Sequence, residues 1–233
     1  MDKSKKIQTT IVNIKYPADD IMEITFKING KRIYFTPGQF IDVEISEKEN
    51  VVRAYSVLRY DIDKNEISIA VKKVPNGLGT TIIFNKFKVG MNINISNAKG
   101  KDLIVDKDSE ELLLVATGIG ITPIYCILED LIKSKFKGKT TFVYGIRHEK
   151  ELHYFNEIKN LLTNKNLNID MIPVVSNQES YKGHKGYVTD IIKDMNLNSK
   201  KIYLCSSKIV ENALIELLTK KNFDLKKFFC ESA

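Results

Sequence analysis

The sequence predicts a two-domain protein, with an N-terminal antiparallel β-barrel followed by an α/β domain built on a parallel sheet. Its 233 residues are 43% hydrophobic, and this length suffices for two modest cores. Apolar and polar residues alternate from residue 6 to about residue 100, whereas short apolar runs separated by helical stripes fill the remainder. A charged stretch, 106–111, lies between the two patterns. We therefore place the domains at residues 1–105 and 106–233.

The barrel is predicted from hydrophobic residues that recur with a period of two, as in half-buried strands. This alternation is present in four runs, Met22–Ile28, Ile41–Ile45, Ile67–Val71 and Ile93–Ile95. The pairs Asn29-Gly30 and Pro37-Gly38 are typical of turns between strands. Short strands joined by such turns indicate an antiparallel barrel or sandwich.

The second domain is predicted from short apolar runs that alternate with helical stripes. Four runs have the length of buried strands, namely Leu112–Ala116, Thr141–Tyr144, Ile169–Val175 and Ile202–Cys205. Apolar residues at helical spacing predict helices over 124–132 and 210–218. Alternating strands and helices imply a parallel sheet with right-handed crossovers.

A glycine-rich turn follows the first predicted parallel strand. Leu112–Ala116 continues directly into Thr117-Gly118-Ile119-Gly120-Ile121-Thr122-Pro123, and a helical stripe comes next. Glycines allow a sharp turn and the close approach of a ligand, and free amides at a helix start favour a pyrophosphate. Glycines in such turns also serve geometry alone, and Pro123 stands where the dinucleotide fingerprint has its third glycine. The turn on its own therefore leaves both interpretations open.

Composition argues against several kinds of site. Cys126, Cys205 and Cys230 are far apart and form no C-x-x-C pair, so neither a disulfide framework nor an iron–sulfur or zinc site is predicted. The three histidines lack the spacing of metal ligands, and we expect no bound metal. Any redox chemistry then needs an organic cofactor.

The net charge is +7, and its lysines are spread along the chain. Such charge suits an acidic macromolecule, an anionic cofactor or nucleic acid equally well. Because no basic motif with interleaved aromatics is present, we expect no nucleic-acid binding. No apolar run approaches the ~20 residues of a membrane span, and residues 1–10 hold no apolar signal segment. We expect a cytoplasmic protein without a membrane span.

Three segments carry a resemblance to a known family. Pro37-Gly38-Gln39-Phe40, then Arg53-Ala54-Tyr55-Ser56, then the glycine turn occur in an order and spacing that resemble the ferredoxin-NADP reductase superfamily. The resemblance implies that the barrel binds FAD and that the α/β domain binds NADH or NADPH. It extends from about residue 6 to the end of the chain.

The resemblance also implies roles for barrel residues. Arg53 would meet the FAD pyrophosphate, Tyr55 would stack on the isoalloxazine, and Ser56 would lie near flavin N5, with Ala54 in the same motif. The turn Asn76–Thr81 resembles the start of the family's short helix beneath the pyrophosphate. Further flavin contacts are implied for Gly79, Thr80, Thr81, Val71 and Lys72. Without the resemblance, Arg53 and Tyr55 read as an ordinary surface arginine and an ordinary barrel aromatic.

In the second domain the resemblance implies a nicotinamide nucleotide site. Its cofactor-binding residues would be Thr117, Gly118, Gly120, Thr122, Pro123, Arg147 and Ser206. Cys205 would lie by nicotinamide C4, and Glu231, in the C-terminal segment 229–233, would approach the flavin. The implied catalytic residues are thus Ser56, Cys205 and Glu231. Taken alone, Cys205 reads as a small buried hydrophobe and Glu231 as a solvated carboxylate. Because the segment stops at Ala233, we expect no aromatic cover on the flavin.

The function that the resemblance implies is a flavoprotein reductase. A hydride would pass from NAD(P)H to FAD, and single electrons would then reach an acidic carrier, either ferredoxin or flavodoxin, or an oxygenase component. Two alternatives stay open, an oxidoreductase that reduces free flavin and an electron-transfer subunit of a larger complex. NADH is favoured because Ser176-Asn177 stands where NADPH-using members tend to have serine and arginine.

Overall fold

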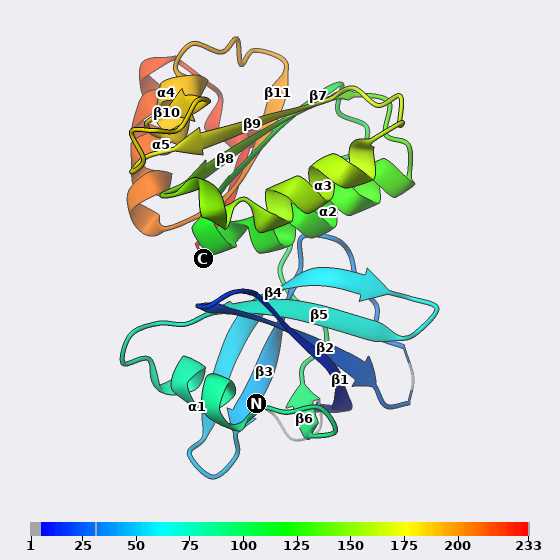
Figure 1. The fold of residues 1–233 in the computed structure, drawn as a ribbon. Coiled ribbons are helices and arrows are strands. Elements are labelled where there is room, and N and C mark those ends of the chain that lie inside the picture. Colours follow the sequence, from blue (N-terminus) through cyan, green and yellow to red (C-terminus); the bar gives the residue numbers. More distant parts are fainter. Residues whose placement is uncertain (1–5, 31, 233) are drawn as a thin grey trace. The chain divides into compact units, whose positions relative to one another are not determined.

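The computed structural model describes residues 6–30 and 32–232, and residues 1–5, Lys31 and Ala233 lie outside this description. The chain divides into two compact units, whose border falls between Ile104 and Val105. Figure 1 shows both units as ribbons. Each has its own sheet and its own core.

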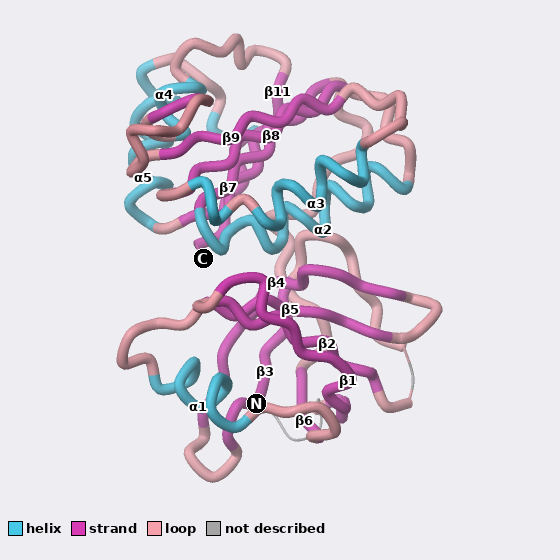
Figure 2. Tube along the Cα trace, in the orientation of Figure 1, coloured by secondary structure: helices cyan, strands magenta, loops and turns pink. Residues whose placement is uncertain are grey.

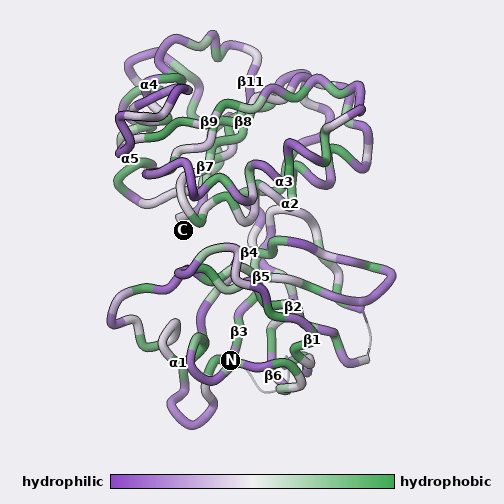
Figure 3. The backbone as a smooth tube through the Cα atoms, viewed as in Figure 1, coloured by the Kyte–Doolittle hydropathy of each residue, from purple (hydrophilic) through white to green (hydrophobic). Residues whose placement is uncertain are grey.

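The first unit is a closed barrel of six antiparallel strands in the order β1-β2-β5-β4-β3-β6. The strands are β1 (Ile7–Ala18), β2 (Ile21–Ile28), β3 (Phe40–Ser46), β4 (Val51–Asp61), β5 (Glu66–Lys72) and β6 (Asn92–Ile95). One helix, α1 (Leu78–Lys86), connects β5 to β6. This architecture confirms the predicted antiparallel barrel. The hairpin tips between the strands are coloured as hydrophilic in Figure 3.

The barrel core consists of the alternating residues that the sequence singled out. Ile24, Phe26, Val43 and Ile69 have no exposed surface, as expected for the inner face of half-buried strands. Strand β2 departs from simple alternation, because its polar residues Glu23 and Thr25 are buried as well. The Glu23 carboxylate pairs with the guanidinium of Arg59 at 2.6 Å, and Thr25 Oγ1 lies 2.9 Å from Ser68 Oγ. Both polar groups are thereby satisfied.

The second unit contains a parallel sheet of six strands in the order β10-β9-β8-β7-β11-β12. The strands are β7 (Glu111–Thr117), β8 (Lys139–Ile146), β9 (Ile169–Val175), β10 (His184–Lys185), β11 (Lys200–Ser206) and β12 (Phe228–Ser232). The helices are α2 (Ile121–Lys133), α3 (His153–Leu162), α4 (Val188–Ile192) and α5 (Lys208–Lys220). This arrangement confirms the predicted α/β domain.

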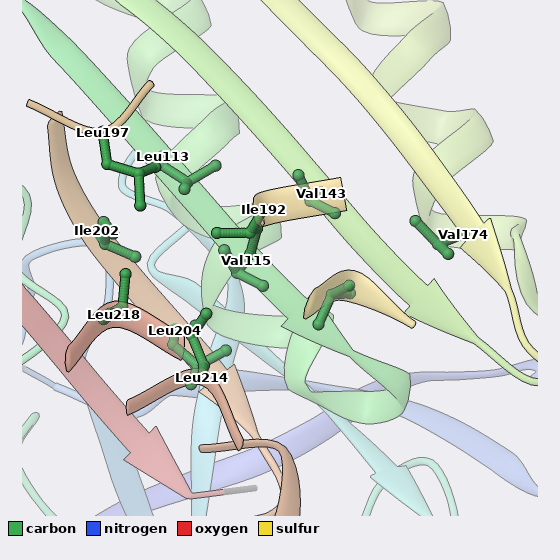
Figure 4. Packing of buried hydrophobic residues seen from close by; sticks show 11 residues of the cluster. Leu113, Val115, Val143, Val174, Ile192, Leu197, Ile202, Leu204, Leu214 and Leu218 are labelled. Atoms are coloured by element: carbon green, nitrogen blue, oxygen red, sulfur yellow. The ribbon is translucent and has the colours of Figure 1, made fainter. Parts of the chain in front are cut away.

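Helices cover both faces of this sheet. Helices α2 and α3 lie side by side on one face, and α4 and α5 lie on the other (Figures 1 and 2). The core beneath α4 and α5 is drawn in Figure 4 and contains Leu113, Val115, Val143, Val174, Val188, Ile192, Leu197, Ile202, Leu204, Leu214 and Leu218. The strands are therefore apolar on both sides, which explains their short continuous hydrophobic runs.

Strand order reverses between β7 and β11, because the chain passes from β7 to β8 on one side and returns to β11 on the other. Ligands of open parallel sheets bind at the carboxyl ends of the strands where the order reverses. The glycine turn begins where β7 ends, so it lies at this position. In the described part of the chain, no helix combines the length and the apolar character that a membrane crossing requires.

Candidate functional site

At one end of the closed barrel, next to the Arg53–Ser56 motif, β4 and β5 stop pairing and leave an opening. Their pairing ends at Val57 and Ile69, whereas Arg53–Ser56 pair only with β3 and Ala70–Lys72 only with β2. Beyond this point, the backbone N–H and C=O groups of β4 and β5 that face each other are therefore not hydrogen-bonded between the two strands. Buried or half-buried peptide groups need partners, so this opening suits a flat ligand rich in donors and acceptors.

Arg53 lies against the start of α1. Gly77 is the N-cap of this helix, and no side chain caps it. A Cβ at Gly79 would stand 3.4 Å from Cγ and 3.9 Å from Nε of Arg53, so the glycine lets the arginine lie across the helix start. The guanidinium donates 2.8 Å to the Val52 carbonyl and is exposed. A guanidinium beside uncapped helix amides forms an anion site, which fits the FAD pyrophosphate.

Tyr55 and Ser56 follow Arg53 on the same strand and are both half-buried, whereas Ala54 is exposed. Burial raises the pKa of the Tyr55 phenol to about 12, against a smaller opposite effect of Arg53. The phenol is therefore neutral at physiological pH. A neutral ring and a hydroxyl beside the strand opening are compatible with the stacking and hydrogen-bonding roles that the sequence implied.

Other predicted flavin residues offer less than the sequence implied. The Thr80 hydroxyl is used within the turn, where it accepts the Val74 N–H at 3.2 Å and lies 3.2 Å from the Gly77 carbonyl. Thr81 is exposed instead. The Val71 side chain is buried in the barrel, so only its backbone can meet a ligand. The Lys72 ammonium lies 3.5 Å from the Asp20 carboxylate.

In the second unit the glycine turn is closed on one side and open on the other. Gly118 adopts a left-handed φ of +52°, and nothing lies within 4 Å of the Cβ that it lacks. A Cβ at Gly120 would stand only 2.2 Å from the Cys205 carbonyl oxygen. Gly120 therefore lets the turn pack against the end of β11, and Gly118 leaves its other side accessible to a ligand.

Thr122, Pro123 and Ser206 are buried, and the two hydroxyls bond nearby backbone rather than face solvent. The buried Thr122 hydroxyl donates 2.7 Å to the Ile119 carbonyl, and Pro123 is buried in the first turn of α2. The fully buried Ser206 hydroxyl donates 3.2 Å to the Ser207 carbonyl. Thr117 and Gly118 are half-buried, so they retain surface that a ligand could meet.

The two predicted catalytic residues of this unit are neighbours. Strands β11 and β12 pair Cys205 with Glu231 in register, which places both side chains on the same face of the sheet. Cys205 is 1% exposed, and burial, assisted by Glu231 and Cys230, raises the pKa of its thiol to about 12. The thiol is therefore protonated at physiological pH and is not a thiolate nucleophile.

Comparison with known protein families assigns both units. Residues 8–102 match the family described as "Oxidoreductase FAD-binding domain", and residues 114–214 match "Oxidoreductase NAD-binding domain". The chain belongs to the oxidoreductases that combine an FAD-binding domain with an NAD-binding domain. The matched domains class it among FAD-dependent oxidoreductases that bind NAD(P)H, as the sequence predicted. This reductase-type chain therefore has one domain for each cofactor.

Individual relatives agree with this assignment. The chain is 28% identical over 180 residues to the xylene/toluene monooxygenase electron transfer component of Pseudomonas putida, covering 76% of this chain and 51% of the relative. It is 26% identical over 211 residues to the ferredoxin–NAD(P)+ reductase component of the naphthalene 1,2-dioxygenase system of the same organism, covering 89% and 63%. The chain spans about half to two thirds of the length of the curated relatives it matches.

Among solved structures, a ferredoxin NADP+ reductase from Neisseria gonorrhoeae with bound FAD and NADP superposes with a TM-score of 0.84. The two sequences are 17% identical, and the alignment covers 98% of each chain. At this identity the likeness is one of fold. It extends over both domains of the reductase-type chain described here.

Sequence reasoning missed a buried carboxylate behind Cys205 and Glu231. Glu211 of α5 is 6% exposed, pairs with the Lys208 ammonium at 2.5 Å and accepts the Ser232 hydroxyl at 3.1 Å. The Lys208 hydrogen bond chiefly holds the pKa of Glu211 below its usual value. Glu211 thereby ties β12 to α5. Its apolar neighbours in the helical stripe gave no sign of this role.

Arg147, the predicted contact of the adenosine end, lies just after the carboxyl end of β8, beside the end of β9. Arg147 is exposed, and its carbonyl accepts the Asn177 N–H at 2.9 Å. Sequence reasoning missed Glu149, whose N–H donates 3.0 Å to Gln178 Oε1. Glu149 and Gln178 line a hollow of about 480 Å³, together with His148 and Lys150. A hollow of about 720 Å³ lies at the amino ends of the strands, away from the edge where parallel sheets bind ligands.

Proposed function

We propose that this chain is a flavoprotein reductase that takes a hydride from NAD(P)H onto FAD and delivers single electrons to ferredoxin, flavodoxin or an oxygenase component. One observation carries the proposal. The same chain contains a barrel in which Arg53 lies against the uncapped start of a helix, and a parallel sheet whose first strand ends in a glycine turn that is open on one side. The relatives named above, described as electron transfer and reductase components of oxygenase systems, support the choice of acceptor. FAD, when bound, supplies the exchange between two-electron and one-electron chemistry.

Within the barrel, we assign Arg53 to the pyrophosphate, since a guanidinium binds phosphate oxygens bidentately. The uncapped amides of α1 beside Gly79 support the same role. Tyr55 presents a neutral aromatic face, and the Ser56 hydroxyl is available to hydrogen-bond the flavin edge. The half-buried position of Tyr55 and Ser56 beside the strand opening supports these roles.

In the nucleotide domain, we assign the pyrophosphate of NAD(P)H to the turn Thr117–Pro123 and its adenosine end to the region of Arg147. Cys205 and Glu231 orient the hydride donor, Cys205 as a neutral thiol and Glu231 as an electrostatic or proton-donating group. Their pairing in register supports a shared role. The buried Thr122 hydroxyl bonds the backbone of this turn at Ile119, and Ser206 directly follows Cys205 at the end of β11.

NADH is the proposed donor. Asn177, at the end of β9, offers a neutral amide where an arginine would pair with a 2′-phosphate, and the nearby Glu149 carboxylate repels such a phosphate. Loss of one charge-assisted contact costs about 1.5–3 kcal/mol, or tenfold to a hundredfold in affinity. The reaction is placed in the cytoplasm, where the three free cysteines would stay reduced.

Absorption spectroscopy and an anaerobic titration test this function. We expect the purified protein to be yellow, to contain one FAD per chain, and to be bleached by NADH at far lower concentration than by NADPH. The reduced protein should then reduce a ferredoxin or flavodoxin. A colourless protein that turns over only with added flavin would identify a free-flavin oxidoreductase. Bleaching by NADH without transfer to any carrier would favour a subunit of a larger complex.

A further inference from the structure

The phenol of Tyr144 lies directly behind the glycine turn. Tyr144 belongs to β8 and pairs in register with Ala116, two residues before Gly118. It is 2% exposed, and its hydroxyl donates a hydrogen bond of 2.9 Å to the Gly118 carbonyl oxygen. A side chain from one strand thus fixes the backbone that follows the next strand.

Ring packing does not account for this hydroxyl. The Tyr144 ring packs in a cluster with Phe142 and Phe155, which also contact each other, with ring centroids 5.9 and 6.2 Å away and interplanar angles of 21° and 11°. A phenylalanine would fill the same space. Burial raises the pKa of the Tyr144 phenol, with a smaller contribution from Glu151, so the group stays a protonated donor. A buried hydroxyl without a partner is costly, and here the partner is Gly118.

The Gly118 carbonyl receives two hydrogen bonds, one from Tyr144 and one from the N–H of Ile121 at the start of α2. Gly118 itself holds a left-handed φ of +52°, and its side toward solvent is open. Gly120 is pressed against Cys205. The turn is therefore fixed from behind at two points and open in front.

We propose that Tyr144 is a positioning residue that holds the glycine turn in the conformation that receives the pyrophosphate of NAD(P)H. This rests on the function proposed above. The turn holds no charged side chain within Thr117–Pro123, so its affinity for an anion depends on backbone groups that are already ordered. Without the Tyr144 hydroxyl, the peptide after Gly118 gains freedom, and binding must include the free energy of ordering it again.

The substitution Tyr144→Phe tests this in the full-length, FAD-loaded protein. We expect the Kd for NADH and for ADP-ribose, which carries the same pyrophosphate, to rise about fivefold, as for the loss of one hydrogen bond. In anaerobic stopped-flow reduction, the NADH concentration for half the limiting rate should rise by the same factor, with the limiting rate unchanged. Amide hydrogen exchange at 117–121, measured without nucleotide, should become faster.

Tyr203→Phe is the matched control. Tyr203 is equally buried in the same sheet, its ring stacks on Phe229 at 4.9 Å, and its hydroxyl accepts the backbone N–H of Asp106 at 3.0 Å. Tyr203→Phe loses the same atom and one side-chain bond to backbone, which the hydroxyl here accepts rather than donates, and it does so away from the turn. We expect wild-type Kd for NADH and wild-type exchange at 117–121.

Two results would overturn the proposed role of Tyr144. One is a wild-type Kd for NADH in Tyr144→Phe, and the other is an equal rise in both variants, which would make the effect one of general stability. Neither result touches the proposed function, because wild-type protein would still bind and oxidise NADH. A wild-type protein that binds neither NADH nor NADPH would overturn both.

Discussion

The two domains hold opposite kinds of candidate anion site. In the barrel, the Arg53 guanidinium lies across an uncapped helix start, and Gly79 is the residue that admits it. In the nucleotide domain, the turn after β7 has no charge of its own, and its shape is set by glycines and by the Tyr144 hydroxyl. One site relies on charge and the other on backbone shape.

The difference matches the two tasks in the proposed function. Hydrogen bonds to a charged group are about twice as strong as neutral ones, so an arginine suits a cofactor that stays bound through many turnovers. A neutral turn suits a co-substrate that must leave after each one. Its binding energy is lower, but its specificity for a pyrophosphate is retained through the arrangement of the backbone.

Substituting alanine for Gly120 and for Gly79, the two close-packed glycines, tests this comparison with the largest expected change in stability. At Gly120 the new methyl would meet the Cys205 carbonyl oxygen at 2.2 Å, and backbone cannot yield. At Gly79 it would meet Cδ1 of Ile45 at 3.0 Å and Cγ of Arg53 at 3.4 Å, which are flexible side-chain atoms. We expect Gly120→Ala to destabilise the protein by about 3 kcal/mol or more and Gly79→Ala by less than about 1 kcal/mol. Denaturant unfolding of both variants measures this, and equal losses would contradict it.

The next test removes the charge on which the barrel site relies. Arg53→Glu places a carboxylate beside the pyrophosphate, so we expect FAD affinity to fall by about a hundredfold and most of the yellow colour to be lost on purification. Arg53→Lys, which keeps the charge but not the bidentate geometry, should lose less. Flavin stoichiometry by absorbance measures both. Full FAD content in Arg53→Glu would remove Arg53 from the site.

A third test concerns the chemistry at the edge of β11 and β12. We expect Cys205→Ala and Glu231→Ala to slow flavin reduction by NADH about tenfold, through lost orientation of the donor, while FAD content stays at the wild-type level. Stopped-flow absorbance measures the rate. Wild-type rates in both variants would show that neither residue contributes to hydride transfer.

The pH dependence sharpens the same test. The folded-state pKa of Cys205 is about 12, well above the ~8.5 of a free thiol. Because the folded value is raised, the thiol contributes stability that is fully present below the unfolded pKa and is lost as pH rises above it. The reduction rate should therefore show no ionisation of Cys205 between about pH 6 and pH 9. A step near pH 8.5 that disappears in Cys205→Ala would contradict the neutral-thiol role.

The regular parts of both domains were predictable because their signals are local. The period-two runs of the barrel and the apolar runs of the parallel sheet each report the burial of their own residues. Helix α3 escaped prediction because its buried residues, Tyr154, Phe155 and Ile158, form only a narrow stripe. Strand β12 was not predicted because it pairs only with β11 and is half-buried, so its residues show no clear apolar pattern.

The site was predictable in its motifs but not in the use of each side chain. Arg53 and Gly79 meet, as do Cys205 and Glu231, because the motifs place them at strand and helix ends. The hydroxyls of Thr80 and Ser206 instead bond the backbone of their own turns. Such bonds depend on the dihedral angles of a few residues, which sequence patterns do not report. The Glu211 contact to Ser232 joins residues 21 positions apart and is likewise invisible in sequence.

The smallest expected effect is on the rate of electron transfer to an acidic carrier. Its test compares lysines of the two domains. In the barrel, Lys72 ends the strand edge that faces the opening and Lys73 follows it, with the Lys73 ammonium over the Phe84 ring at 5.6 Å. In the other domain, Lys226 and Lys227 precede β12, so they lie at the amino edge of the sheet, opposite the end that holds Glu231. The barrel also contains Lys99, whose ammonium is paired with Asp42 at 2.5 Å.

We therefore expect charge reversal at Lys72 and Lys73 to lower the second-order rate of electron transfer to an acidic ferredoxin or flavodoxin severalfold at low salt. Reversal at Lys226 and Lys227 serves as the control and should change this rate little. Because exposed charges are screened beyond ~8 Å at physiological ionic strength, the wild-type rate should fall with added salt, while reduction of a small neutral dye stays constant. Flavin content of each variant is measured first. Rates that respond neither to salt nor to either pair of substitutions would remove the acidic carrier and leave free flavin or a subunit partner as the acceptor.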